Sequence, residues 1–168
     1  MTEGEWQSLY CIPFKATKET KLRAFQMKLL HRILPTNRWL HQCQLIPTNS
    51  CSFCHIHIET LDHLFWDCIV TKNIWLKFRD WLKSLDIHKD LPSKEQVLLG
   101  DPLSQTYFEH LKLIIKEQIY KCKIRETIPS FDSIKNAIRI ILKIEKYNMP
   151  VTSFNRKWDR KIRTYFGL

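Results

Sequence analysis

Residues 51–68 read CSFCHIHIETLDHLFWDC, and this stretch decides the fold prediction. It contains four soft or borderline metal ligands within eighteen positions: Cys51, Cys54, His63 and Cys68. Zinc in structural sites takes four such ligands in a tetrahedron, and a Cys-x-x-Cys turn directs two thiolates toward one point. The spacing therefore predicts a Zn²⁺ site held by these four residues.

Two other interpretations of the cysteines stay open. A Cys-x-x-Cys pair also fits a thioredoxin-type redox motif, but no βαβ pattern surrounds this pair, and the histidine and third cysteine would then have no role. Alternatively, each cysteine is a small buried apolar side chain. His55 and His57 are second-choice ligands on a stretch predicted to be solvated. The other cysteines are predicted to lie in the core: Cys11, Cys43 and Cys122.

The five-residue separation of His63 and Cys68 constrains the local backbone. On a straight α-helix it places the two side chains about 140° apart around the axis, too far for one metal. We therefore predict that the helix either ends before Cys68 or contains a π-type turn, which brings residues i and i+5 onto one side.

Helical periodicity extends on both sides of the motif. Only 3 residues are Gly, so turns that need positive φ are scarce and helices are favoured over hairpins. Helices are predicted over 17–34, from Thr36 to about 43, from Thr60 through 65, along an apolar stripe at 74–85, and over 103–126, 131–147 and 154–165, with a loop over 47–59. The fold class is therefore mainly α: short helices around a zinc-stapled Cys-Cys-His-Cys knuckle, followed by a bundle of longer amphipathic helices.

Composition excludes several classes of protein. With 44% hydrophobic and 26% charged residues, the chain is expected to fold rather than to be disordered or fibrous. No apolar run approaches the roughly 20 residues of a membrane span, so no membrane is expected. The first residues, MTEGEW, lack the apolar segment of a secretory signal. An intracellular location, in cytoplasm and nucleus, follows as the expectation.

The net charge of +10 suggests a polyanionic partner. Residues 101–168 carry 14 basic and 7 acidic residues. On the two predicted carboxy-terminal helices, cations lie opposite apolar faces and are expected to contact phosphates: Lys135, Arg139, Lys143 and Lys146 on the first, and Arg156, Arg160 and Arg163 on the second. The alternatives are a solvated charged face or a helix on a membrane surface, although the latter needs an exposed apolar face.

Aromatic residues near the cysteines could stack on unpaired bases. Phe53 lies inside the cysteine turn, where we expect little room for burial, and it is the favoured stacking residue. Trp39 lies on an apolar stripe and is expected to pack in the core.

Residues 6–75 resemble the zinc-binding segment that follows the reverse transcriptase in non-LTR (LINE-type) retrotransposon polyproteins. The matching pieces are KLRAFQMKLLH at 21–31, ILPTN at 33–37, CSFC at 51–54, ETLDHLFWDC at 59–68, and Trp75. The resemblance implies zinc ligation by Cys51, Cys54, His63 and Cys68. It also implies a carboxy-terminal, non-catalytic module that helps hold template RNA or target DNA during target-primed reverse transcription.

The resemblance and the composition together define an expected organisation. Residues 1–90 form a reverse-transcriptase-type zinc-binding domain, residues 91–102 a linker and residues 103–168 a basic helical region. No adjacent aspartate pair occurs, so the two-metal carboxylate centre of a polymerase is absent and no enzymatic activity is expected. The chain looks like a detached tail: a truncated element, an expressed fragment or a co-opted domain.

Two functions from different classes follow. The first is a nucleic-acid-binding module for RNA or single-stranded DNA, with a reverse transcriptase core as a further partner. The alternative is a protein-interaction module that docks on a polymerase or ribonucleoprotein. The salt dependence of binding distinguishes them, because phosphate contacts weaken steeply with ionic strength.

Overall fold

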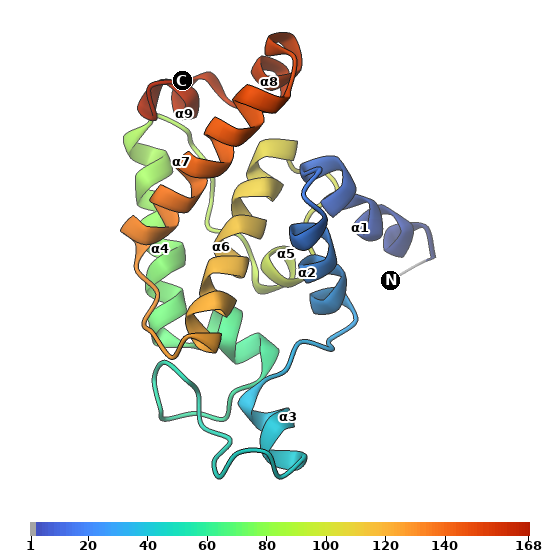
Figure 1. The fold of residues 1–168 in the computed structure, drawn as a ribbon, viewed down its shortest axis with the longest axis vertical. Helices are drawn as coiled ribbons and strands as arrows, with labels where there is room; N and C mark the ends of the chain where they lie inside the picture. The colour runs from blue at the N-terminus through green and yellow to red at the C-terminus, as the bar shows by residue number, and fades with distance from the viewer. Residues whose placement is uncertain (1–2) are drawn as a thin grey trace.

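The computed structural model describes residues 3–168, and within this range the chain forms helices and no strand (Figure 1). In chain order these are α1 (Glu3–Ala16), α2 (Thr20–Leu30), α3 (Asn37–Gln42), the π-helix η1 (His63–Asp67), α4 (Ile69–Ser84), α5 (Lys94–Leu98), α6 (Thr106–Ile124), α7 (Phe131–Asn148), α8 (Val151–Lys157) and α9 (Arg160–Tyr165). The mainly-α prediction is confirmed.

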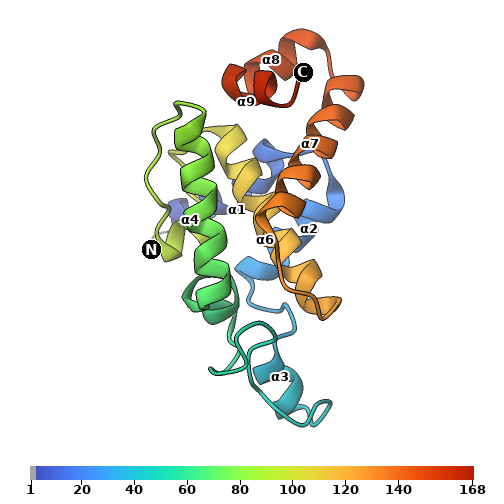
Figure 2. The same ribbon diagram turned by 90° about the vertical axis from the view of Figure 1, so that its left-hand side faces the viewer.

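Helix α6 is the centre of the fold. It packs against α1, α2 and α7, and α7 also contacts α4. Its residues Leu111, Ile114, Ile115 and Ile119 are fully buried, as expected of a helix with neighbours on several sides. Figure 1 shows α6 between α4 and α7 on one side and α1 and α2 on the other, and in the turned view of Figure 2 α4 and α7 lie on either side of α6.

Buried polar side chains also connect α6 to its neighbours. The Lys116 Nζ donates to Gln26 Oε1 of α2 at 2.6 Å, and the Gln26 amide donates to the Leu98 carbonyl at 3.0 Å. The Lys112 Nζ lies 2.6 Å from Glu109 and donates to the carbonyl of Gln96 in α5. Buried polar groups need such partners, so these contacts fix how α2, α5 and α6 pack.

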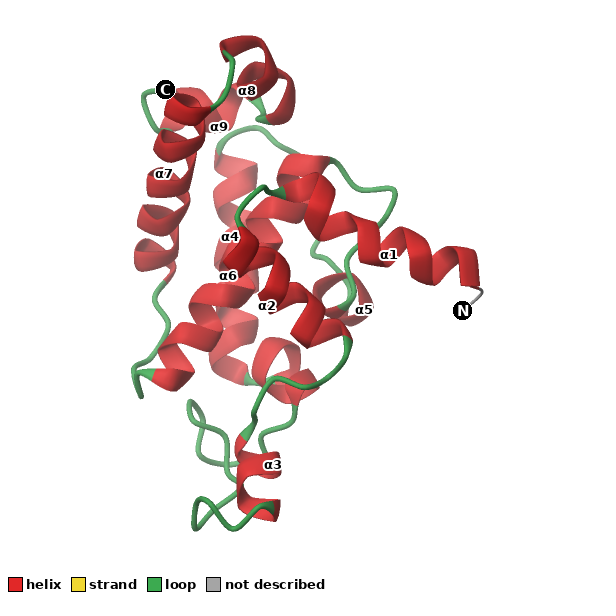
Figure 3. Cartoon of the chain, turned by 45° about the vertical axis from the view of Figure 1, so that its right-hand side comes forward, coloured by secondary structure: helices red, strands yellow, loops and turns green. Residues whose placement is uncertain are grey.

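The two ends of the long axis carry different elements. Helix α3 and the loops that hold the cysteines project from one end, whereas α8 and α9 cover the other (Figures 1 and 3). The predicted loop over 47–59 is confirmed and contains only an isolated bridge between Ser50 and Ile58.

Helix predictions at the two termini need correction. Periodicity does not reveal α1, which contains Pro13. The single helix predicted over 154–165 is wrong, because the backbone at Trp158 is extended, with φ −99° and ψ 134°. The Asp159 side chain then accepts a hydrogen bond from the Lys161 backbone N–H at 2.8 Å and caps α9.

The segment 91–102, expected to be a linker, contains α5, which begins with a capping box formed by Ser93 and Gln96. The division into residues 1–90, 91–102 and 103–168 stays a prediction, and helices from both sides of this segment share one buried apolar cluster. Within residues 3–168, no helix is both long and apolar enough to span a membrane.

Candidate metal centre

The four predicted metal ligands come together at the end of the molecule that carries α3. One ligand atom from each of Cys51, Cys54, His63 and Cys68 lies within 4.8 Å of all the others. The Cys51 and Cys68 sulfurs are 3.8 Å apart, and Cys54 Sγ is 3.3 Å from His63 Nε2. A zinc ion about 2.3 Å from sulfur and 2.0–2.1 Å from nitrogen gives tetrahedral edges of about 3.8 and 3.5 Å. The donor set and its spacing therefore fit one tetrahedral zinc.

The π-helix η1 brings His63 and Cys68 to the same side. The Cys68 backbone N–H donates to the His63 carbonyl at 2.8 Å, which is the i+5 to i bond of a π turn. Thr60 begins the turn, because its hydroxyl accepts from the His63 backbone N–H at 3.0 Å. The predicted distortion is confirmed.

Trp75 stabilises the carboxyl side of this turn. Its indole N–H donates to the Phe65 carbonyl at 2.8 Å, and Trp75 is fully buried. A π turn leaves carbonyls without their ordinary i+4 partner, and a buried unpaired carbonyl costs free energy. The indole therefore supplies a hydrogen bond that the altered helix cannot.

The Cys-x-x-Cys turn is held by backbone groups around Cys51. The Phe53 N–H points at Cys51 Sγ at 3.4 Å, and the His55 N–H donates to the Cys51 carbonyl at 3.0 Å. The Cys51 N–H donates to the carbonyl of His57 at 2.8 Å. His55 takes the positive φ of 56° that closes the turn.

The two buried thiols, Cys51 and Cys68, are joined by a hydrogen bond. A hydrogen bond from the Cys51 thiol, together with backbone N–H groups of Val70 and Thr71 at the start of α4, lowers the pKa of Cys68 to about 5. The same hydrogen bond and burial raise the pKa of Cys51. A zinc ion is bound by thiolates, so metal binding displaces the remaining thiol protons.

A buried carboxylate, Glu59, organises the loops around the metal ligands. It is 0% exposed. One oxygen accepts from the Asn37 backbone N–H at 2.8 Å, and the other accepts from the N–H and hydroxyl of Ser52 at 2.8 and 2.6 Å. Because Ser52 follows the first ligand, Glu59 fixes the cysteine turn against the start of α3.

The cation that balances Glu59 comes from α6. The Lys123 Nζ lies 3.3 Å from Glu59 Oε1 and donates to Asn37 Oδ1 at 2.9 Å, and Lys123 is only 7% exposed. One turn earlier on α6, the Tyr120 hydroxyl donates to the Pro35 carbonyl at 3.1 Å. Nothing in the sequence spacing links residue 59 to residue 123, so sequence reasoning misses this network.

The segment that contains the four ligands is similar to a known protein family. Residues 2–75 match the family model described as zinc-binding in reverse transcriptase. Over these residues the chain is similar to the zinc-binding domain of reverse transcriptases. The match contains all four cluster residues, Glu59 and Trp75, whereas Lys123 lies outside it. No curated protein and no solved structure matches the chain.

The exposure of two aromatic side chains of the zinc-binding domain is the reverse of what the sequence predicts. Phe53 is only 5% exposed, because the cysteine turn folds its ring into the apolar cluster, so the expectation of little room for burial is wrong. Trp39, expected in the core, is 52% exposed on α3. Trp39 is therefore the side chain that offers a free ring at this end.

The other cysteines, and two nearby histidines, stay apart from the cluster. Cys11 and Cys43 are exposed, which corrects their assignment to the core, and Cys122 is half-buried. His55 and His57 are exposed. The His57 ring packs 5.4 Å from the His63 ring without joining the four clustered ligand atoms.

The predicted cationic residues lie at the end far from the cysteines and along α7. Arg139, Lys143 and Lys146 are exposed, whereas Lys135 is half-buried and pairs with Asp132 at 2.8 Å. The prediction that Arg156, Arg160 and Arg163 share one face of a single helix is wrong, because α8 and α9 are separate helices. These three residues instead line one hollow of about 720 Å³, together with Lys15 at the end of α1.

Proposed function

We propose that this chain is a non-catalytic zinc-binding module that binds RNA or single-stranded DNA and assists target-primed reverse transcription, next to a reverse transcriptase core, inside the cell. The family match and the Cys-Cys-His-Cys cluster support zinc binding. The observation that carries the nucleic-acid part is the hollow lined by Arg156, Arg160, Arg163 and Lys15.

The hollow suits phosphate for electrostatic reasons. Arg156 and Arg160 are exposed, whereas Arg163 is half-buried and donates to Asn155 and to the Trp158 carbonyl. Asp159 is the one carboxylate among the lining residues, and it already accepts the cap hydrogen bond of α9. Guanidinium groups bind phosphate oxygens through paired donors, and each contact releases condensed counterions.

Zinc has a structural role in this proposal. Cys51, His63 and Cys68 are buried, and three thiols with one imidazole complete a tetrahedron without an open position. The ion would fix the loops that support α3. Helix α3 then presents Trp39 beside the exposed Arg38, a ring and a cation suited to an unpaired base and its phosphate.

Zinc content tests the metal site. Purified protein is expected to contain one zinc per chain. Cys54→Ser should lose the zinc and much of the stability of the cysteine loops. Cys43→Ser is the matched control, because Cys43 is exposed and outside the cluster. Full zinc occupancy and unchanged stability in Cys54→Ser would refute the ligand assignment.

Affinity for an oligonucleotide at several salt concentrations tests the hollow. Replacing Arg156 and Arg160 by Gln should weaken binding to RNA and single-stranded DNA alike and flatten the logarithmic salt slope by roughly 1.4, at about 0.7 per phosphate contact. The control replaces two exposed lysines of α4, Lys72 and Lys83, by Gln and removes the same charge. If both double variants lose the same affinity, the effect depends only on net charge and the proposal is overturned.

A further inference from the structure

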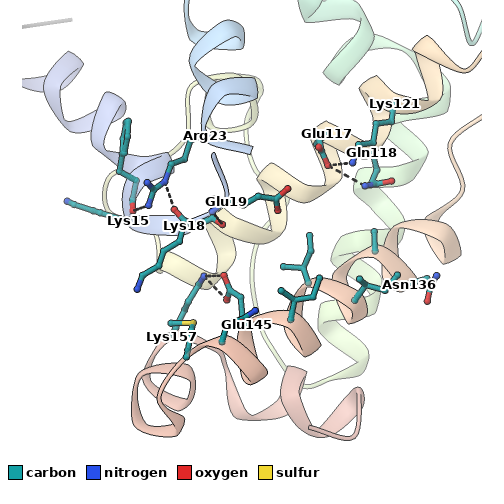
Figure 4. Close-up of a pocket in the computed structure, with 18 of the residues that line it drawn as sticks. Lys15, Lys18, Glu19, Arg23, Glu117, Gln118, Lys121, Asn136, Glu145 and Lys157 are labelled. Carbon is teal, nitrogen blue, oxygen red and sulfur yellow. Dashed lines mark hydrogen bonds and ion pairs between the residues drawn. The ribbon is translucent and has the colours of Figure 1, made fainter. Parts of the chain in front are cut away.

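A second hollow lies between α7 and the α1–α2 turn, with α6 as its floor (Figure 4). Its volume is about 730 Å³. Along α7 it is lined by residues that recur at helical spacing: Ser133, Asn136, Ala137, Ile140, Ile141, Ile144, Glu145 and Asn148. From Ser133 to Asn148 this stripe extends about 22 Å, four helical turns at about 1.5 Å per residue.

The middle of this stripe, from Ala137 to Ile144, is a second apolar face of α7. The first face, formed by Ile134, Ile138 and Leu142, is buried in the core. On the second face Ile140 is 49% and Ile144 is 54% exposed. This apolar patch is about 10 Å long, two helical turns, and is rimmed by polar groups, so it can receive the apolar face of a helix through residues i, i+3, i+4 and i+7.

Cations border the groove on both sides. Lys15 and Lys18 lie at the α1–α2 turn with no ion pair among the described residues, near Arg23 (Figure 4). On the other side, Arg139 and Lys143 do not line the groove itself but are exposed on α7, about 60° to 100° around the helix from Ile140. Two of the lining carboxylates are neutralised internally, Glu117 by Lys121 at 2.7 Å and Glu145 by Lys157 at 2.6 Å.

We propose that this groove binds one amphipathic α-helix of a partner protein, with an apolar stripe that contacts Ile140 and Ile144 and acidic residues on both flanks. We assign acidic flanks to the partner helix because each flank would face exposed lysine or arginine side chains at the rim of the groove. Nucleic acid fits less well, because the half-exposed Ile140 and Ile144 offer its phosphates no polar or cationic partner. A second copy of this chain, with net charge +10, would bring cationic rims together.

The probes are two designed 20-residue helical peptides that carry the same leucine stripe and differ only in glutamate or lysine flanks. Binding to the full chain is measured by fluorescence anisotropy. The glutamate peptide should bind at least tenfold more tightly than the lysine peptide. Replacing Ile140 and Ile144 by Gln should weaken its binding roughly tenfold or more through lost apolar contact. Both residues are half-exposed, so these changes should leave the fold intact.

Tyr147→Gln is the matched control, because Tyr147 lies on the same helix, is 90% exposed and does not line the groove. The proposal is overturned if both peptides bind equally, if neither peptide binds, or if the glutamate peptide binds the isoleucine variant as tightly as it binds the unchanged chain. Sedimentation at the same protein concentrations tests the second copy, and a dimer lost in the isoleucine variant would assign the groove to self-association instead. Loss of single-stranded DNA binding in that variant, without peptide binding, would assign it to nucleic acid.

Discussion

Replacing Lys123 by Met tests whether the zinc-binding domain depends on α6. Glu59 is fully buried and the Lys123 side chain is 6% exposed, so the variant leaves a carboxylate in a dry environment without its cation. Breaking one partner of such a pair costs about 3–5 kcal/mol. Because Glu59 keeps its hydrogen bonds from Asn37 and Ser52, we expect the lower end, about 3 kcal/mol of unfolding free energy.

Urea denaturation of the zinc-loaded protein measures this loss, and chelator competition measures zinc affinity on the same samples. Supporting contacts around metal ligands change metal affinity by about 10- to 100-fold, so Lys123→Met should weaken zinc binding in that range. Lys121→Met is the control: its side chain is 44% exposed and pairs with Glu117, so its loss should cost less than about 1 kcal/mol.

The double variant Glu59→Gln with Lys123→Met separates charge from packing. It removes the uncompensated carboxylate, so it should regain part of the stability and zinc affinity that Lys123→Met loses. If Lys123→Met matches Lys121→Met in both measurements, the network does not support the metal site and the reasoning is refuted.

Three further variants probe other contacts. Trp39→Ala should weaken oligonucleotide binding by about 1–3 kcal/mol per stacked base without changing the salt slope. Phe53→Ala should instead lower the unfolding free energy by about 3–5 kcal/mol. The reverse pattern would show that Phe53 is the stacking residue. Trp75→Phe leaves the Phe65 carbonyl unpaired and should cost about 1–3 kcal/mol in urea denaturation, and no loss would show that the carbonyl finds another donor. Burial lowers the pKa of Lys116 to about 7 from 10.5. The unfolded chain therefore binds more protons than the folded chain between about pH 7 and 10, and the unfolding free energy should rise with pH in that window. Lys116→Met should flatten this rise, and an unchanged slope in the variant would contradict the prediction.

The metal cluster and the π turn were predictable because both follow from spacing within one short stretch. Four ligand types in eighteen positions allow few geometries, and the i+5 separation of His63 and Cys68 excludes a straight helix. The long helices α6 and α7 were predictable for a similar reason, since their apolar periods extend over several turns.

The errors arise where a local pattern fits two environments. Phe53 and Trp39 are both aromatic residues in short segments, and periodicity over one or two turns does not say which faces the core. The break at Trp158 did have a signal, because Asp159 is a preferred helix-capping residue, but the apolar spacing continues through it. The Glu59 and Lys123 pair joins residues far apart in the chain, which no local pattern contains.

The contacts of α6 determine how much of this protein can be transplanted. A graft of residues 2–75 alone would carry every cysteine of the cluster but would leave behind the Tyr120 ring that lies 5.9 Å from Phe25 and 6.4 Å from Phe65. It would also leave Glu59 without a cation. A chimera that is meant to keep the metal centre therefore has to include residues 106–124, or provide a helix that places a tyrosine and a lysine three residues apart against the same loops.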